Sequence, residues 1–151
     1  SASLLLVIAM AGIYGYALNI VGLRAWLGGL LVALPGGVLP KLFIIWLVMF
    51  VLGMFIDPGS SIIITTPIFL PFIIGYGLDP VWYGVWVCLA SELGCITPPV
   101  GLTLYAVQSV SGEELEIVAK GAIPYWAAYV MAQLPITVFP GIATWLVRIM
   151  V

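Results

Sequence analysis

The sequence predicts an all-α protein with several transmembrane helices, and three observations lead to that class. Hydrophobic residues make up 64% of the 151 residues and charged residues only 7%, with a mean hydropathy of +1.29. Soluble domains carry about a quarter charged residues, so this chain would expose large apolar patches in water. Its apolar runs suit helices in a lipid bilayer, at about 20 residues for each span. Clusters of Gly, Pro and hydroxyl residues interrupt these runs, and the length accommodates roughly five or six spans.

Charge and composition exclude several classes of function. The net charge of −2, from four basic and six acidic residues, argues against a nucleic-acid partner. The sequence has no histidine, which removes histidine acid–base and metal chemistry. Cys88 and Cys95 are seven residues apart on an apolar helix and are interpreted as small hydrophobes, not as a zinc or redox pair. No catalytic residue and no cofactor is predicted.

The first part of the sequence is interpreted as the end of a longer membrane region. Ser1 is not an initiator Met, and no basic region precedes the first apolar run, so we expect no signal peptide. Residues 1–151 are therefore interpreted as the C-terminal part of a longer protein. Ser3–Leu18 is predicted as the remainder of a span, and Leu23–Leu34 as a short segment at the membrane interface.

Residues 38–75 predict a helical hairpin. An apolar helix over Val38–Ile56 stops at Asp57-Pro58-Gly59-Ser60-Ser61, because the residue before a proline avoids the α region and Gly59 adds backbone freedom. A second apolar helix, Ile62–Ile74, follows at once, so the two helices must be antiparallel neighbours. Lys41 lies near one end, where its ammonium is expected to reach the headgroups.

Residues 80–111 predict one span that is broken in the middle. Asp79 is expected to cap a helix over Val81–Glu92, and a second helix is expected from about Val100 to Val110. Between them lies Gly94-Cys95-Ile96-Thr97-Pro98-Pro99.

A short polar helix is expected after this span, ending at Lys120, with Ser111 or Gly112 as its cap. The C-terminal helices are predicted after it, within residues 121–151. A span over Ala122–Phe139 and a last helix over Gly141–Val151 complete the chain.

The break at Gly94–Pro99 is the main candidate site. Backbone groups without partners are costly in lipid, so such breaks persist where protein or a bound solute satisfies them. Pro98 and Pro99 remove two amide donors, which should free the carbonyls of about Gly94 to Ile96, and Thr97 adds a hydroxyl. Neutral oxygens gathered in this way suit Na⁺. The alternative is a plain proline kink that neighbouring helices satisfy.

Two further features have two interpretations each. The Asp57–Ser61 turn is either a hairpin turn at the water interface, with Asp57 as a solvated cap, or a re-entrant tip whose Ser60 and Ser61 hydroxyls reach the membrane midplane. Glu92, one turn before the break, is either a coupling site or a structural support that receives hydrogen bonds from loose backbone amides.

The sequence resembles the large (DctM-like) membrane subunit of tripartite ATP-independent periplasmic (TRAP) transporters. Nearly the whole chain matches the C-terminal part of that subunit. The motifs that carry the resemblance, in chain order, are Gly53-Met54-Phe55-Ile56-Asp57-Pro58, Thr66-Pro67-Ile68-Phe69-Leu70-Pro71, Asp79-Pro80-Val81-Trp82-Tyr83-Gly84 and Glu92-Leu93-Gly94-Cys95-Ile96-Thr97-Pro98-Pro99-Val100-Gly101. The chain departs from the family pattern at Ala90, Cys95 and Thr103, which leaves the substrate open.

The resemblance implies the second half of an inverted-repeat, elevator-type transporter of the bacterial or archaeal inner membrane. It implies Na⁺-coupled uptake of organic acids, of the C4-dicarboxylate or sialic-acid type. A periplasmic binding protein would deliver the substrate, and a small membrane subunit would be the partner within the bilayer. The implied Na⁺ site lies between the hairpin tip and the break, with candidates Gly53, Asp57, Ser60, Ser61, Gly94, Ile96, Thr97 and Pro98. Substrate-side candidates are Thr97, Gly101 and Thr103, with Glu92 and Pro99 as structural support.

Three alternatives stay open from the sequence. One is another inverted-repeat ion-coupled carboxylate symporter, although the Ser-Asn-Thr tip signatures of the dicarboxylate/sodium symporters are absent. An intramembrane enzyme would need apposed aspartates, whereas Asp57 and Asp79 both precede proline at helix ends. A structural membrane subunit without its own site would not need two polar breaks.

Overall fold

The computed structural model describes residues 13, 17, 20–22, 26, 29 and 35–150. The segments predicted over Ser3–Leu18 and Leu23–Leu34 lie outside the described residues, apart from these isolated positions. Six helices make up the continuous part, which confirms the all-α class: α3 (Val38–Phe55), α4 (Pro58–Gly75), α5 (Pro80–Cys95), α6 (Leu102–Ser111), α7 (Leu115–Val138) and α8 (Gly141–Met150).

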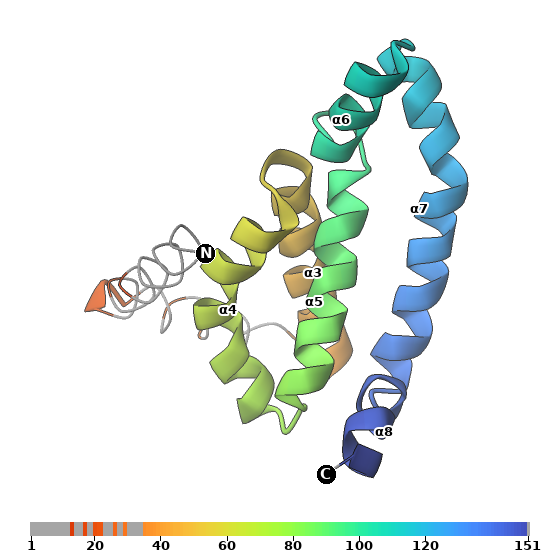
Figure 1. The fold of residues 1–151 in the computed structure, drawn as a ribbon. Coiled ribbons are helices and arrows are strands. Elements are labelled where there is room, and N and C mark those ends of the chain that lie inside the picture. The colour runs from red at the N-terminus through yellow and green to blue at the C-terminus, as the bar shows by residue number, and fades with distance from the viewer. Residues whose placement is uncertain are drawn as a thin grey trace.

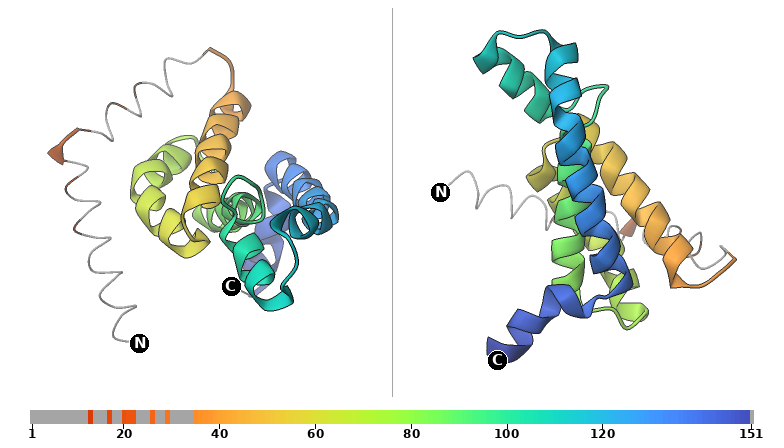
Figure 2. Two further views of the ribbon diagram at one scale, coloured as in Figure 1. Left: turned by 90° about the horizontal axis from the view of Figure 1, so that it is seen from above. Right: turned by 90° about the vertical axis from the view of Figure 1, so that its right-hand side faces the viewer.

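Helix α5 is the centre of the arrangement. It contacts α3 and α4 on one side and α7 and α8 on the other (Figures 1 and 2). Helices α3 and α5 rise in the same direction, whereas α4 and α7 descend (Figure 1). The turn between α3 and α4 therefore lies at the same end of the molecule as the end of α5.

The core forms where the hairpin packs on α5. Helix α3 contributes Leu42, Ile45 and Met49 to it, and α4 contributes Phe69 and Ile73. The part from α5 is aromatic and small-aliphatic, comprising Trp82, Tyr83, Trp86, Val87 and Ala90. Because these residues exclude solvent and pack closely, they hold the three helices in one register.

Two buried tryptophans attach α7 to this core. The indole N–H of Trp82 donates to the carbonyl of Ile136 at 2.7 Å, and that of Trp86 donates to the Thr137 hydroxyl at 2.8 Å. Both side chains are fully buried. An indole N–H that leaves water needs such a partner, so these bonds fix the position of α7 against α5.

Helices α3 and α4 are long and apolar enough to cross a membrane, judged by length and composition. Their outward faces carry large apolar side chains, such as Leu39, Phe43 and Val51 of α3. A contiguous apolar surface of this kind is expected on a helix that faces lipid or another protein. Helix α4 also contains Pro67 and Pro71, and it curves along its length (Figure 1).

A buried lysine joins the two helices at the open end of the hairpin. Lys41 is only 6% exposed. Its Nζ donates to the Tyr76 hydroxyl at 2.6 Å and lies 5.0 Å from the centre of that ring. Since Tyr76 follows the last residue of α4, this contact joins the beginning of α3 to the end of α4 and closes the antiparallel pair.

The region after the break also differs from the prediction. The expected short helix ending at Lys120 and the span after it form one continuous helix, α7, whose N-cap is Glu114. Gly112 ends α6 instead of beginning a helix, with φ +72°. That left-handed conformation favours glycine and is typical of helix C-termini. The boundary between α6 and α7 therefore lies just after Gly112, a few residues later than expected.

Candidate functional site

The site begins where α3 crosses α5 at two glycines. A Cβ built on Gly94 would lie 2.9 Å from the Cα of Gly53 and still closer to the carbonyl oxygen of Phe50. A Cβ built on Gly53 would lie 3.1 Å from the Cα of Ser91 and in direct collision with its carbonyl oxygen. Any side chain at either glycine would therefore separate the helices. The two glycines bring the C-terminal ends of α3 and α5 together.

The hairpin tip and the break are joined by two more contacts near this crossing. The amide of Gly101, in the break, donates to the carbonyl of Met54 at 3.0 Å. The hydroxyl oxygens of Ser61 and Ser91 lie 3.1 Å apart, and both side chains are fully buried. Ser91 was not among the residues that the sequence suggested, because a single serine inside an apolar helix carries no local signal.

The predicted break is present between α5 and α6. Ile96 caps the end of α5, and the chain resumes helical structure at Leu102 after a cis peptide bond between Pro98 and Pro99. Gly101 adopts φ +55°, a left-handed conformation that permits the turn into α6. The break is thus a change of chain direction and not a kink within one continuous helix.

Several carbonyls at the break have no partner. Within the described residues, no hydrogen bond reaches the carbonyl oxygens of Cys95, Ile96 or Thr97. For Gly94 the expectation was wrong, because its carbonyl accepts the Thr97 amide at 2.9 Å in a tighter turn. The oxygens of Cys95 and Thr97 converge, since they would lie 3.2 and 3.0 Å from a Cβ on Gly101. Only a glycine leaves that space open.

The end of α3 provides further oxygens. Among the described residues, the carbonyls of Gly53 and Phe55 accept no hydrogen bond, whereas Leu52 and Met54 are bonded to the Ile56 and Gly101 amides. Two helix C-termini with free carbonyls therefore meet at the Gly53–Gly94 crossing. The negative ends of both helix dipoles lie there, and together these favour a cation.

The Thr97 hydroxyl, just beyond the end of α5, bonds back to that helix. It donates its proton to the Leu93 carbonyl at 2.5 Å. A hydroxyl has one proton and two acceptor lone pairs, so the oxygen can still accept or coordinate. Thr97 is half-buried. This arrangement is compatible with a neutral ligand for Na⁺.

Asp57 and Ser60 occupy a different position from Ser61. Asp57 is exposed and caps α4, accepting the Ser60 amide on Oδ2 at 2.9 Å. Among the described residues, no hydrogen bond joins either residue to the break. Ser61 faces the other way, into the α4–α5 contact. The structure brings Gly53, Ser61, Gly94 and Gly101 together but leaves Asp57 and Ser60 at the rim.

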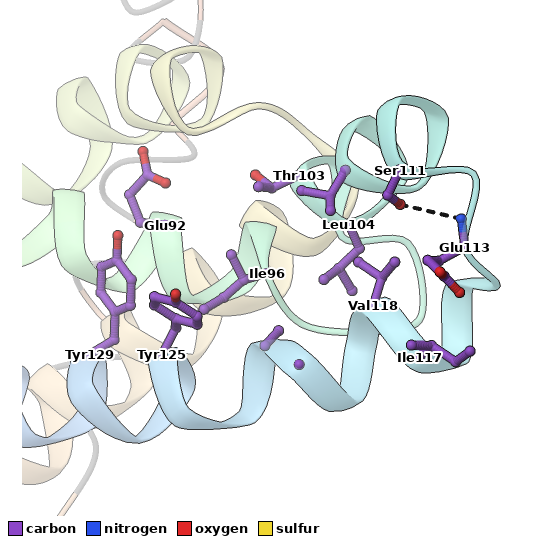
Figure 3. A pocket seen from close by; sticks show the side chains of 13 residues that line it. Glu92, Ile96, Thr103, Leu104, Ser111, Glu113, Ile117, Val118, Tyr125 and Tyr129 are labelled. Carbon is purple, nitrogen blue, oxygen red and sulfur yellow. Dashed lines mark hydrogen bonds between the residues drawn. The ribbon is translucent and has the colours of Figure 1, made fainter.

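Glu92 and Thr103 lie on the opposite face of the break, in a cavity between α5, α6 and α7. The cavity has a volume of about 620 Å³, and Figure 3 shows Glu92 with Tyr125 and Tyr129 of α7 on its wall. Glu92 is half-buried, and its carboxylate forms no hydrogen bond with the described residues, so it does not support loose amides of the break. The Thr103 hydroxyl donates to the Cys95 sulfur at 3.3 Å.

The charge of this cavity bears on what it could hold. Its lining includes the carboxylates of Glu92 and Glu113 and no basic side chain. An organic anion placed there would meet two like charges in partly apolar surroundings. In the described part of the chain, no group of three His, Cys, Asp or Glu side chains forms a site for a metal ion.

A hairpin of apolar helices packed on a helix that is broken beside it, with free carbonyls at the junction, is an arrangement that secondary membrane transporters use. Comparison with known proteins specifies this class. The family model of the tripartite ATP-independent periplasmic transporter, DctM component, matches residues 1–142. The chain therefore belongs to that family of transporters, and not to an enzyme family.

Named relatives agree with this assignment. The chain is 32% identical to the C4-dicarboxylate TRAP transporter large permease protein DctM of Vibrio cholerae over 110 residues, 73% of this chain and 24% of that protein. It is 28% identical to the isethionate TRAP transporter permease protein DctMQ of Oleidesulfovibrio alaskensis, covering 94% and 22%. It is 29% identical to the sialic acid TRAP transporter permease protein SiaT of Haemophilus influenzae, covering 80% and 20%.

The chain spans between about a fifth and a third of the length of the curated relatives it matches. No solved structure matches it.

Proposed function

We propose that this chain forms the ion-coupling half of a Na⁺-driven permease that imports organic acids across the bacterial or archaeal inner membrane as a multi-pass protein. The observation that carries the proposal is the meeting of two helix C-termini at Gly53 and Gly94. The free carbonyls of Gly53, Cys95 and Thr97 and the Thr97 hydroxyl supply neutral oxygens in the field of two helix dipoles. Unwound carbonyls and the C-terminal ends of broken helices coordinate Na⁺ in secondary transporters.

The break beside this junction offers a place for the carboxylate of the substrate. Helix α6 begins at Leu102, and the amides of Val100 and Leu102 donate to no described residue. Free amides at a helix N-terminus bind anions. A bound Na⁺ on the neighbouring carbonyls would lower the cost of placing an anion there. This reciprocal stabilisation is the proposed basis of coupling, with elevator-type movement of the hairpin and broken helix between the two sides.

The relatives support the partners and the substrate class. Three of the matched permeases are named for a C4-dicarboxylate, isethionate and sialic acid, all of which carry an acidic group, and another is named for ectoine. We therefore propose an organic acid as substrate, a periplasmic binding protein that delivers it, and a small membrane subunit that braces the permease. The alternatives are an inverted-repeat carboxylate symporter coupled to H⁺ and a subunit without its own site.

Uptake by the complete transporter in proteoliposomes tests the proposal. With the binding protein present, uptake of a labelled C4-dicarboxylate or sialic acid should require an inward Na⁺ gradient that K⁺ does not replace. Thr97→Ala should raise the Na⁺ concentration for half-maximal uptake. The matched control is Thr66→Ala in α4, because the Thr66 hydroxyl also bonds back one turn, to the Ile62 carbonyl at 2.6 Å. Uptake that is independent of Na⁺ and unaltered by Thr97→Ala would refute the proposal.

A further inference from the structure

Ser91 is a buried residue of α5 that touches both helices of the hairpin. Its carbonyl oxygen lies directly against Gly53 of α3. Its hydroxyl oxygen lies 3.1 Å from that of Ser61 in the first turn of α4, and both serines are fully buried. Ser91 is also one turn before Cys95, whose carbonyl is free. One residue thus contacts the end of α3, the beginning of α4 and the last turn of α5.

The direction of the hydrogen bond between the serines follows from their other contact. The Ser61 hydroxyl oxygen lies 2.9 Å from the carbonyl oxygen of Pro58. A carbonyl only accepts, so the single proton of Ser61 is directed to Pro58, and the Ser91 hydroxyl donates to Ser61. The Ser91 hydroxyl therefore holds the first turn of α4 on α5 through a bond between two neutral groups.

The Ser91 hydroxyl bonds differently from most other hydroxyls on the helices. Most hydroxyls of the described residues donate to a carbonyl three or four residues earlier in the chain, which satisfies them locally. The Ser91 hydroxyl makes no such bond within the described residues, although the carbonyl of Val87 lies in the usual position. The hydroxyls that bond locally are those of Ser61, Thr65, Thr66, Thr97, Ser109, Thr137 and Thr144.

We propose that Ser91 is a positioning residue, which fixes the hairpin tip in its place against the broken helix. Its bond to Ser61, together with the contact at Gly53, sets the free carbonyls of α3 beside those of α5. The inference rests on the proposed function, because Ser91 would hold the ligands of the proposed Na⁺ site in place without being a ligand itself.

The test compares Ser91→Ala and Ser91→Cys with Ser109→Ala in the complete transporter. Ser109 is a suitable control because its exposed hydroxyl bonds only within α6, to the Ala106 carbonyl at 2.8 Å. Ser91→Ala should raise the Na⁺ concentration for half-maximal uptake by about threefold to tenfold, since one buried hydrogen bond is lost. The maximal rate at saturating Na⁺ should change less. Ser91→Cys, which is slightly larger and donates only weakly, should resemble Ser91→Ala.

A second measurement is independent of transport. Hydrogen–deuterium exchange of the amides of residues 57–62 should be faster in Ser91→Ala than in wild type and unchanged in Ser109→Ala. The double variant Ser61→Ala/Ser91→Ala should match the more affected single variant, because both substitutions remove the same bond.

The outcomes separate the two proposals. Wild-type uptake without Na⁺ dependence overturns the proposed function, and the exchange rates then decide whether Ser91 positions the tip. Na⁺-dependent wild-type uptake, with unchanged half-maximal Na⁺ and unchanged exchange in Ser91→Ala, overturns the role of Ser91 and leaves the proposed function standing. Equal effects of Ser91→Ala and Ser109→Ala on half-maximal Na⁺ and on exchange would also overturn the role of Ser91.

Discussion

Gly53 and Gly94 face each other where α3 crosses α5, so closely that the Cα and carbonyl carbon of Gly53 would lie 2.9 Å from a Cβ on Gly94. The two helices therefore touch backbone to backbone. Such contact is a common way for membrane helices to associate, because small residues allow close packing without an apolar driving force. Here it also decides where the free carbonyls of the two helix ends come to lie.

Gly94→Ala should therefore disrupt the packing of the hairpin on α5. The methyl group would collide with the backbone of α3, which cannot rotate away as a side chain can, and we expect a loss of about 3 kcal/mol or more in stability. Unfolding of the purified transporter in detergent, followed by tryptophan fluorescence, measures the change. The control is Gly84→Ala in the same helix, where a Cβ meets nothing within 4 Å. Gly84→Ala should be neutral or stabilising by up to about 1 kcal/mol.

Gly101→Ala should impair Na⁺ binding beyond its effect on stability. Gly101 has φ +55°, and an added Cβ would lie 3.0 Å from the Thr97 carbonyl oxygen and 3.2 Å from that of Cys95. Gly77→Ala is the matched control, because Gly77 has φ +72° with no atom near the added Cβ. Both variants should lose about 1–2 kcal/mol from backbone strain. Only Gly101→Ala should also raise the Na⁺ concentration for half-maximal uptake; an equal rise in both would argue against a site at these carbonyls.

Tyr76→Phe should destabilise the open end of the hairpin more than Lys41→Met. Removing the Tyr76 hydroxyl leaves the buried Lys41 ammonium without its 2.6 Å partner, which costs about 1–3 kcal/mol. Lys41→Met removes the charge together with its need for a partner, and methionine keeps most of the volume. Chemical unfolding of both variants gives the comparison. If Lys41→Met were the more damaging, the contact would be an attraction that adds net stability.

Asp57→Ala should weaken the beginning of α4 by about 1 kcal/mol, because the Ser60 amide loses its acceptor. Asp57→Asn should restore the cap and hence the stability. Asp79→Ala and Asp79→Asn are the matched controls, since Asp79 caps α5 by accepting the Val81 amide at 2.8 Å. Uptake assays then separate charge from capping: if Asp57 contributes charge to Na⁺ binding, Asp57→Asn should raise half-maximal Na⁺ at normal stability, whereas Asp79→Asn should not.

Local signals in the sequence were sufficient for several features. Asp79 was predicted as a helix cap, and the structure confirms it, because an Asp before a proline has one dominant local role. The break at Gly94–Pro99 was also predicted, since two prolines remove amides wherever they lie. Prediction was incomplete where a distant contact decides the geometry. Tyr76, 35 residues after Lys41, accepts a hydrogen bond from its ammonium, and no local pattern indicates that contact.

The membrane class, the all-α fold, the hairpin turn and the position of the break follow from the sequence itself. Each depends on residues close together in the chain, through apolar run length, missing proline amides and capping side chains. Tertiary structure alone decided which oxygens meet. The pairing of Ser61 with Ser91, the crossing of Gly53 and Gly94, and the separation of Asp57 and Thr103 from that crossing depend on how α3, α4 and α5 pack. Packing sums many weak contacts between distant residues, and no local pattern encodes that sum.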